Sequence, residues 1–77
     1  MDARKKAQEG IALIKDAVLE LLVQNKGGLR NFEIADALGL RSHQAGGMKD
    51  FLTYSTLGLL IADGKVIKQG KQYLAAT

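Results

Sequence analysis

Residues 28–40 read GLRNFEIADALGL and contain the local signals that decide the fold. Asn31 is a good N-cap for a helix, and Glu33 falls in the first turn, where the helix dipole favours a carboxylate. The apolar side chains recur on one short face, formed by Phe32, Ile34, Ala35 and Leu38. Gly39 can adopt a positive φ and would end the helix at its C′ position. The stretch therefore predicts a short helix with a defined start and stop, preceded by an extended segment at Leu29.

A longer amphipathic helix is predicted before this stretch. Apolar residues recur at spacings of three and four, which places them on one helical face. The members of this stripe are Ile11, Ile14, Val18, Leu21 and Leu22, flanked by Leu13 and Ala17. Residues 25–28, NKGG, place a lysine and two glycines where the helix would end. Because Gly10 weakens the helix before it, residues 1–10 are expected to form a frayed N-terminal extension.

A third helix and a hairpin are predicted after the short helix. Residues 41–47 are polar and contain a Gly-Gly pair, so we expect them to be irregular. A long helix follows from about Met48 to Ala62. Two β-prone runs, residues 65–68 and 72–74, flank a glycine turn and predict a β-hairpin. The core of the domain is expected to bury five apolar residues of the three helices together: Val18, Ile34, Leu38, Leu57 and Leu60.

The size and composition indicate one globular domain over residues 1–77. The chain is 47% hydrophobic and 25% charged, which is typical of a folded domain. It has no cysteine and one histidine, His43, so neither a disulfide framework nor a multi-histidine metal site is expected. No apolar run has the length of a membrane span, and the polar N-terminus does not resemble a signal peptide. We expect a soluble, cytoplasmic protein.

Nothing in the sequence favours an enzyme. Two acidic pairs, Asp16 with Glu20 and Glu33 with Asp36, are predicted on helix exteriors, away from any nucleophile or general base. No cofactor and no small-molecule substrate are expected.

The positive charge is concentrated in the second half of the chain. Residues 1–40 carry six basic and six acidic groups, whereas residues 41–77 carry five basic and two acidic groups, which accounts for the net charge of +3. A polyanion would therefore meet the C-terminal half. A solvated, slightly basic surface explains the same charge without any partner.

The predicted element order resembles the winged helix-turn-helix family. Residues 28–40 look like the family's entry strand and second helix, with its common IA..LGL ending. The family pattern L-x-x-L-x-x-x-G-x-V is matched at Leu57, Leu60, Gly64 and Val66. Gly70 and the Tyr73-Leu74 pair fit the wing's tip and return strand. The resemblance covers residues 11–75 and implies a mainly α, three-helix winged helix-turn-helix domain with a small β-hairpin.

The sequence departs from the family pattern at the third helix. A tight helix-turn-helix has a turn of about 3–4 residues, whereas residues 41–47 intervene here. One side of the third helix would be formed by Met48, Phe51, Leu52, Ser55 and Leu59. The roughly opposite side would be formed by Tyr54, Leu57, Leu60 and Ile61, with Tyr54 expected in the core. Few polar residues then remain to read a DNA groove.

The resemblance implies binding of double-stranded DNA, with the third helix in the major groove and the wing on the backbone or minor groove. The candidate contacts are Arg41, Ser42, His43, Gln44, Lys49, Thr53, Thr56, Lys65, Lys68 and Lys71. Each has a structural alternative: the wing lysines can protect an edge strand, residues 41–44 can form a solvated loop, and the threonines can be ordinary helix residues. The expected role is a small transcriptional regulator or the DNA-recognition module of a larger system.

The alternative function is a protein-interaction or dimerisation module built on a winged helix. A single core cannot cover two apolar sides of one helix, so a patch formed by Met48, Phe51, Leu52 and Leu59 would face water. Turns of the first helix around Ala3 and Ala7 could fold back over it. Otherwise, we expect a homodimer or a protein partner to cover apolar surface of the third or first helix.

Overall fold

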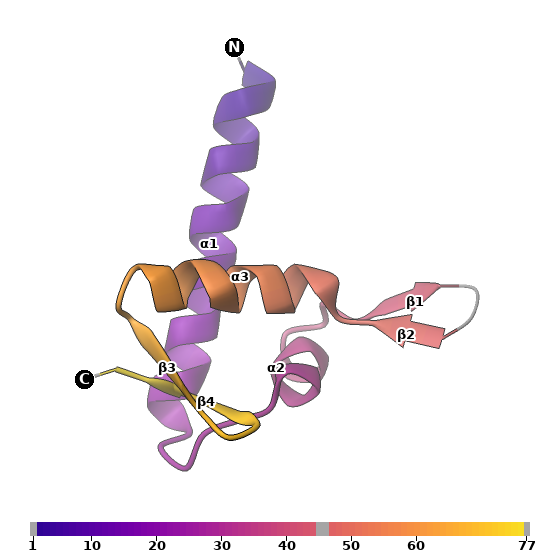
Figure 1. The fold of residues 1–77 in the computed structure, drawn as a ribbon. Helices are drawn as coiled ribbons and strands as arrows, with labels where there is room; N and C mark the ends of the chain where they lie inside the picture. Colours follow the sequence, from indigo (N-terminus) through magenta and orange to yellow (C-terminus); the bar gives the residue numbers. More distant parts are fainter. Residues whose placement is uncertain (1, 45–46, 77) are drawn as a thin grey trace.

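The computed structural model describes residues 2–44 and 47–76 (Figure 1). Within these residues, three helices and two β-hairpins follow one another along the chain. The elements are α1 (Asp2–Gln24), α2 (Asn31–Ala37), β1 (Ser42–Gln44), β2 (Gly47–Lys49), α3 (Phe51–Ala62), β3 (Val66–Gln69) and β4 (Gln72–Ala75). The fold is the mainly α, three-helix arrangement with a hairpin wing that the sequence predicts.

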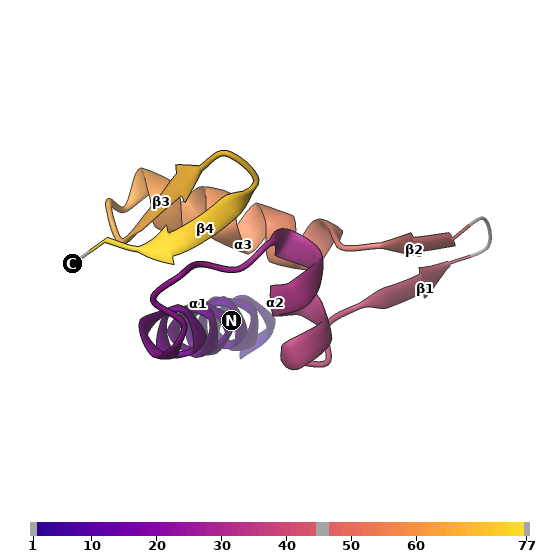
Figure 2. The ribbon, with the colours of Figure 1, turned by 90° about the horizontal axis from the view of Figure 1, so that it is seen from below.

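The elements are arranged around a crossing of two helices. Helix α3 crosses α1 near the middle of α1, and the β3–β4 wing lies on one side of α3 (Figure 1). The N-terminal half of α1 projects beyond α3 on the other side, and the β1–β2 hairpin projects from the start of α3 (Figures 1 and 2). An ion pair between Lys15 Nζ and Asp63 Oδ2, 3.2 Å apart, links α1 to the end of α3.

One hydrophobic core joins the three helices and the wing. Its buried members are Val18, Leu22, Ile34, Leu57, Leu60, Val66 and Tyr73. The predicted burial of Val18, Ile34, Leu57 and Leu60 is therefore confirmed, while Leu38 is half-buried and packs against the edge of this cluster. Helices α1 and α3 and the wing thus have fixed positions relative to one another.

The segment between α1 and α2 ties the helices to the wing. Gly28 has a φ of +89°, and a side chain there would meet the Leu74 side chain at 3.1 Å and the Tyr73 carbonyl oxygen at 3.2 Å. Leu29 and Tyr73 exchange two backbone hydrogen bonds, 3.0 and 2.7 Å long, so the entry segment adds a β-bridge to the wing. Only glycine combines the left-handed φ with this close approach.

Helix α1 is longer than predicted. The frayed extension expected for residues 1–10 is helical from Asp2 onward, and Met1 lies outside the described residues. Residues 2–9 are exposed and continue the axis of the helix (Figure 1). The turns around Ala3 and Ala7 therefore do not fold back over α3.

Helix α2 ends as predicted but begins differently. Gly39 has a φ of +69°, and the Leu40 N–H donates to the Ala35 carbonyl at 2.8 Å, which closes the helix. Arg30, not Asn31, is the N-cap residue, and its N–H donates to Glu33 Oε1 at 2.8 Å. Asn31 is instead the first helical residue, so its side chain is free to contact another element.

The segment predicted to be irregular contains an antiparallel hairpin. Strands β1 and β2 pair Ser42 with Lys49, His43 with Met48 and Gln44 with Gly47. Residues 45–46 of that prediction lie outside the described residues. Because Met48 and Lys49 pair with the preceding strand, α3 begins at Phe51 instead of about Met48.

The predicted wing is confirmed, with boundaries shifted by about one residue. Strands β3 and β4 pair antiparallel in a register that places Lys68 opposite Tyr73. Gly70 has a φ of +62° in the turn between them. Val66 and Tyr73 are buried, which anchors both strands on the core.

Candidate nucleic-acid interface

A shallow groove lies where the start of α2, the first turns of α3 and the wing meet. Its volume is about 390 Å³. The lining residues are Arg30, Asn31, Phe32, Asp50, Tyr54, Lys68, Lys71 and Tyr73. Side chains far apart in the sequence therefore line one surface.

Three cations from separate elements converge on this groove. Arg30 precedes α2, Lys68 lies on β3, and Lys71 lies in the turn between β3 and β4; all three are exposed. Lys68 Nζ lies 5.4 Å from the centroid of the Tyr73 ring, the cross-strand neighbour of Lys68. This cation–π contact holds the ammonium group beside the groove.

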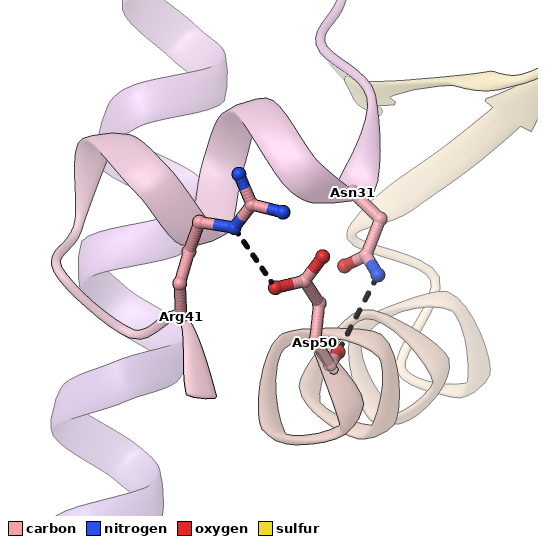
Figure 3. Close-up of polar contacts among 3 residues, drawn as sticks. All are labelled: Asn31, Arg41 and Asp50. Atoms are coloured by element: carbon pink, nitrogen blue, oxygen red, sulfur yellow. Dashed lines mark hydrogen bonds and ion pairs between the residues drawn. The ribbon is translucent and has the colours of Figure 1, made fainter. Parts of the chain in front are cut away.

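The acidic residue of the groove is already paired. Asp50 Oδ1 lies 3.3 Å from Arg41 Nε, and only 13% of the Asp50 side chain is exposed (Figure 3). The Asp50 carbonyl accepts hydrogen bonds from Tyr54 N–H at 3.0 Å and from Asn31 Nδ2 at 3.4 Å. Asp50 thus joins three elements, and its charge is offset by Arg41, which leaves the cations of the groove dominant.

Two exposed aromatic rings share the groove with the cations. Phe32 and Tyr54 expose about half of their surface, 47% and 58% respectively. The Arg41 guanidinium lies 6.0 Å from the centroid of the Phe32 ring. Exposed rings next to cations offer flat surfaces for sugars or bases beside charged groups for phosphates.

The predicted contact residues are only partly brought together. Lys68 and Lys71 line the groove, whereas the exposed Lys65 precedes β3 and is not among the lining residues. Arg41 lies at the base of the first hairpin, paired with Asp50. Four others belong to the strands of that hairpin, and their side chains lie outside what the structure describes: Ser42, His43, Gln44 and Lys49.

The prediction that Thr53 and Thr56 contact DNA is wrong, because both are fully buried, with 0% exposure. They lie on the stripe of α3 that also carries Leu57 and Leu60, at spacings of three and four. The Thr56 hydroxyl donates to the Leu52 carbonyl at 2.8 Å. Thr53 Oγ1 is buried and has no hydrogen-bond partner in the described structure.

Six of the eight groove residues were absent from the predicted contacts, and the exposed ones among the six are Arg30, Phe32 and Tyr54. Arg30 immediately precedes α2, but no feature of the neighbouring sequence indicates that its side chain lines the same groove as the wing lysines. Phe32 was assigned to the apolar face of α2, and Tyr54 to the core, yet both are exposed. The sequence feature that comes closest to indicating this site is the lysine-bearing hairpin, whose register places Lys68 opposite Tyr73 beside the groove.

The remaining surface of α3 is apolar. From Phe51 to Ala62 the helix contains no charged residue. Its large exposed side chains are Phe51 (70%), Leu52, Tyr54, Leu59 and Ile61. The expectation that Phe51, Leu52 and Leu59 face water is confirmed, and Tyr54 and Ile61 join them. The side chain of Met48, the fourth member of the expected patch, lies outside what the structure describes. Such a surface offers few hydrogen-bonding groups to base edges.

Comparison with protein-family models, curated proteins and solved structures gave no match. Within residues 2–44 and 47–76, no helix has both the length and the apolar character needed to cross a membrane. The same residues contain no group of three or more His, Cys, Asp or Glu side chains arranged to hold a metal ion.

Proposed function

We propose that the protein binds double-stranded DNA through the groove between the wing, α2 and α3. The observation that carries this proposal is the convergence of Arg30, Lys68 and Lys71 on one surface whose acidic residue is paired with Arg41. Cations on a shared surface neutralise successive phosphates of a polyanion. The proposed role is that of a cytoplasmic transcriptional regulator or a DNA-recognition module.

The mechanism is phosphate contact with little direct reading of bases. Arginine and lysine contacts to phosphates fix the position of a protein on the duplex without recognising sequence. The solvent face of α3 adds Tyr54 as the polar group nearest the groove. Preference among duplexes would therefore arise mainly from their shape and deformability.

The test is a titration of labelled duplex DNA at several salt concentrations. Three phosphate contacts predict a slope of log K against log [salt] of about −3. The double variant Lys68→Glu, Lys71→Glu should weaken binding to all duplexes equally, because phosphates carry no sequence information. The matched control is Lys5→Glu, Lys26→Glu, which makes the same change in net charge at exposed positions away from the groove. A slope near zero, or equal losses in the two double variants, would contradict the proposal.

A second candidate function, a protein-interaction module, is favoured by the uncharged exposed face of α3. Exposed apolar patches of several hundred Å² are typical of interaction sites. Four large apolar side chains exposed on this helix lie outside the groove and support this role: Phe51, Leu52, Leu59 and Ile61. The two functions use different parts of α3 and are compatible.

A further inference from the structure

We infer that the groove receives unpaired nucleotides, whose bases stack on the rings of Phe32 and Tyr54. DNA with a single-stranded end then binds more tightly than a fully paired duplex. The inference rests on the proposed binding of DNA in this groove, and it deepens that function by naming the form of DNA that the groove accepts.

The groove presents two kinds of group, and a fully paired duplex uses only one of them. Arg30, Lys68 and Lys71 can contact phosphates, which lie on the outside of any nucleic acid. Phe32 and Tyr54, 47% and 58% exposed, present aromatic rings. Inside a duplex the flat faces of the bases are covered by neighbouring base pairs, so a protein reaches only base edges from the grooves. A ring stacks on a base where that base is unpaired.

The two rings stand on helix starts that a shared hydrogen-bond acceptor holds together. Phe32 is the second residue of α2, and Tyr54 lies in the first turn of α3. The Asp50 carbonyl accepts from the Tyr54 N–H at 3.0 Å and from Asn31 Nδ2 at 3.4 Å, which links the two helix starts (Figure 3). Because the helical backbone already positions both rings, less conformational entropy is lost when bases stack on them.

Cations accompany both rings. The Arg41 guanidinium lies 6.0 Å from the centroid of the Phe32 ring. Tyr54 and Lys68 line both the groove and a smaller hollow of about 150 Å³, so this ring and this cation border the same two cavities. A single strand presents a base and a phosphate in every nucleotide. Rings and cations on one surface are the combination that binds such a strand.

The size and charge of the groove also favour unpaired nucleotides. Its volume of about 390 Å³ is near the lower end of the ~300–1,000 Å³ typical of small-molecule sites. A groove of this size has room for individual nucleotides, whereas a double helix can only lie across its opening. The charge of Asp50 is offset by Arg41, so it does not oppose the phosphates. Stacking is sequence-tolerant, because every base has an aromatic face.

The experiment compares three DNAs that share one duplex sequence, by fluorescence-anisotropy titration with the full chain. One has blunt ends, one carries a single-stranded thymidine overhang, and one carries an overhang of equal length made of abasic residues. The two overhangs add the same number of phosphates, so phosphate contact alone gives them equal affinity. We expect the base-bearing overhang to bind at least about fivefold more tightly than the abasic one, which is the effect of one stacked base.

Variants of the full chain test whether the rings cause this preference. Phe32→Leu and Tyr54→Leu should each lower the affinity ratio of the two overhangs to about half or less, because each removes one stacking ring. The matched control is Phe51→Leu, which removes a ring that is 70% exposed but does not line the groove. This control should keep the wild-type ratio. Lys68→Glu should weaken binding of all three DNAs by similar factors, since all three contain phosphates.

The outcomes separate this inference from the proposed function. Equal affinity for the two overhangs would overturn the inference, and so would a preference that both ring variants retain or that Phe51→Leu lowers as much as they do. Circular dichroism establishes that each variant is folded, and the wild-type comparison alone is decisive if a variant is not. Salt-dependent binding of the blunt duplex with equal affinity for the two overhangs overturns the inference alone. A preference for the base-bearing overhang without salt-dependent binding of the blunt duplex overturns the duplex proposal alone.

Discussion

Helix α3 has a core face and a solvent face, and the polarity of the side chains does not separate the two. Thr53 and Thr56 are buried, while Phe51 and Tyr54 are exposed. The core face is selected by the spacing of Leu57 and Leu60, and any residue one turn earlier on that stripe is buried with them. Position along the helix, and not polarity, therefore decides which residues of α3 form the core.

The two buried threonines are tolerated for different reasons. Thr56 satisfies its hydroxyl within the helix, through the bond to the Leu52 carbonyl one turn earlier. Thr53 has no partner for its hydroxyl in the described structure, and its methyl group is the part suited to the core. Burial of Thr56 therefore costs little free energy of folding, whereas burial of Thr53 leaves its hydroxyl unpaired.

The largest difference in stability between the two faces of α3 is expected when a charged residue is placed on each. Thr56→Lys should destabilise the domain by more than about 4 kcal/mol, because an unpaired ammonium would be buried in the core. Ser55→Lys, at the exposed neighbouring position, should change the free energy of unfolding by under ~0.5 kcal/mol. Urea denaturation of both variants measures the difference. Equal stability would mean that the helix is rotated relative to the structure.

The adjacent leucines give the next largest contrast. Leu60 is 1% exposed, and Leu60→Ala should cost about 2–5 kcal/mol through lost burial and the cavity left behind. Leu59→Ala should cost about 1 kcal/mol or less in dilute protein, because nearly half of the Leu59 side chain is already in water. Thermal unfolding by circular dichroism at low concentration compares the two. A larger loss for Leu59→Ala than for Leu60→Ala would reverse the assignment of the faces.

The two buried threonines provide a finer test. Thr53→Val should stabilise the domain by about 1 kcal/mol, since it removes an unsatisfied hydroxyl and keeps the shape of the side chain. Thr56→Val should destabilise by about 0.5–1 kcal/mol, because it removes a hydrogen bond that is made. The free energies of unfolding should therefore move in opposite directions. Changes of the same sign would show that the Thr53 hydroxyl has a partner in solution.

The smallest effect on stability is expected at the most exposed ring of α3. Phe51→Ser should alter the free energy of unfolding by about 0.5 kcal/mol or less, since 70% of the Phe51 residue is accessible. It should instead reduce binding of a hydrophobic dye such as ANS. A strong destabilisation of the dilute protein would place Phe51 in the monomer core.

Local signals in the sequence were sufficient for much of the fold. Gly39 and Gly70 adopt the positive φ that their turns require, and both elements next to them form where predicted. Val66 is buried in the core, as the hairpin prediction requires. In these regions a short range of residues determines the backbone, so composition and spacing are informative.

Long-range contacts account for what the sequence did not reveal. The apolar residues of α3 surround the helix, so the sequence pattern identified the buried Leu57 and Leu60 but placed the exposed Tyr54 in the core with them. The first hairpin lacks the alternation of a half-buried strand, and its two ends meet through a pair nine residues apart, Arg41 and Asp50. The groove joins Arg30 to Lys68, which only the folded wing brings near. Lys68 and Lys71 of the candidate site were therefore predictable from the sequence, and the other lining residues required the tertiary structure.

The Arg41–Asp50 pair also allows the connection between α2 and α3 to vary in length. The two side chains bring together the residue before β1 and the residue after β2. Both ends are thus held on the body of the domain, while the hairpin between them extends outward (Figure 2). Lengthening a loop whose ends are already close costs little conformational entropy. Related chains could exchange the segment 42–49 for a short turn or a longer arm and keep the same three-helix body, so this position is a natural point of insertion during evolution and in engineering.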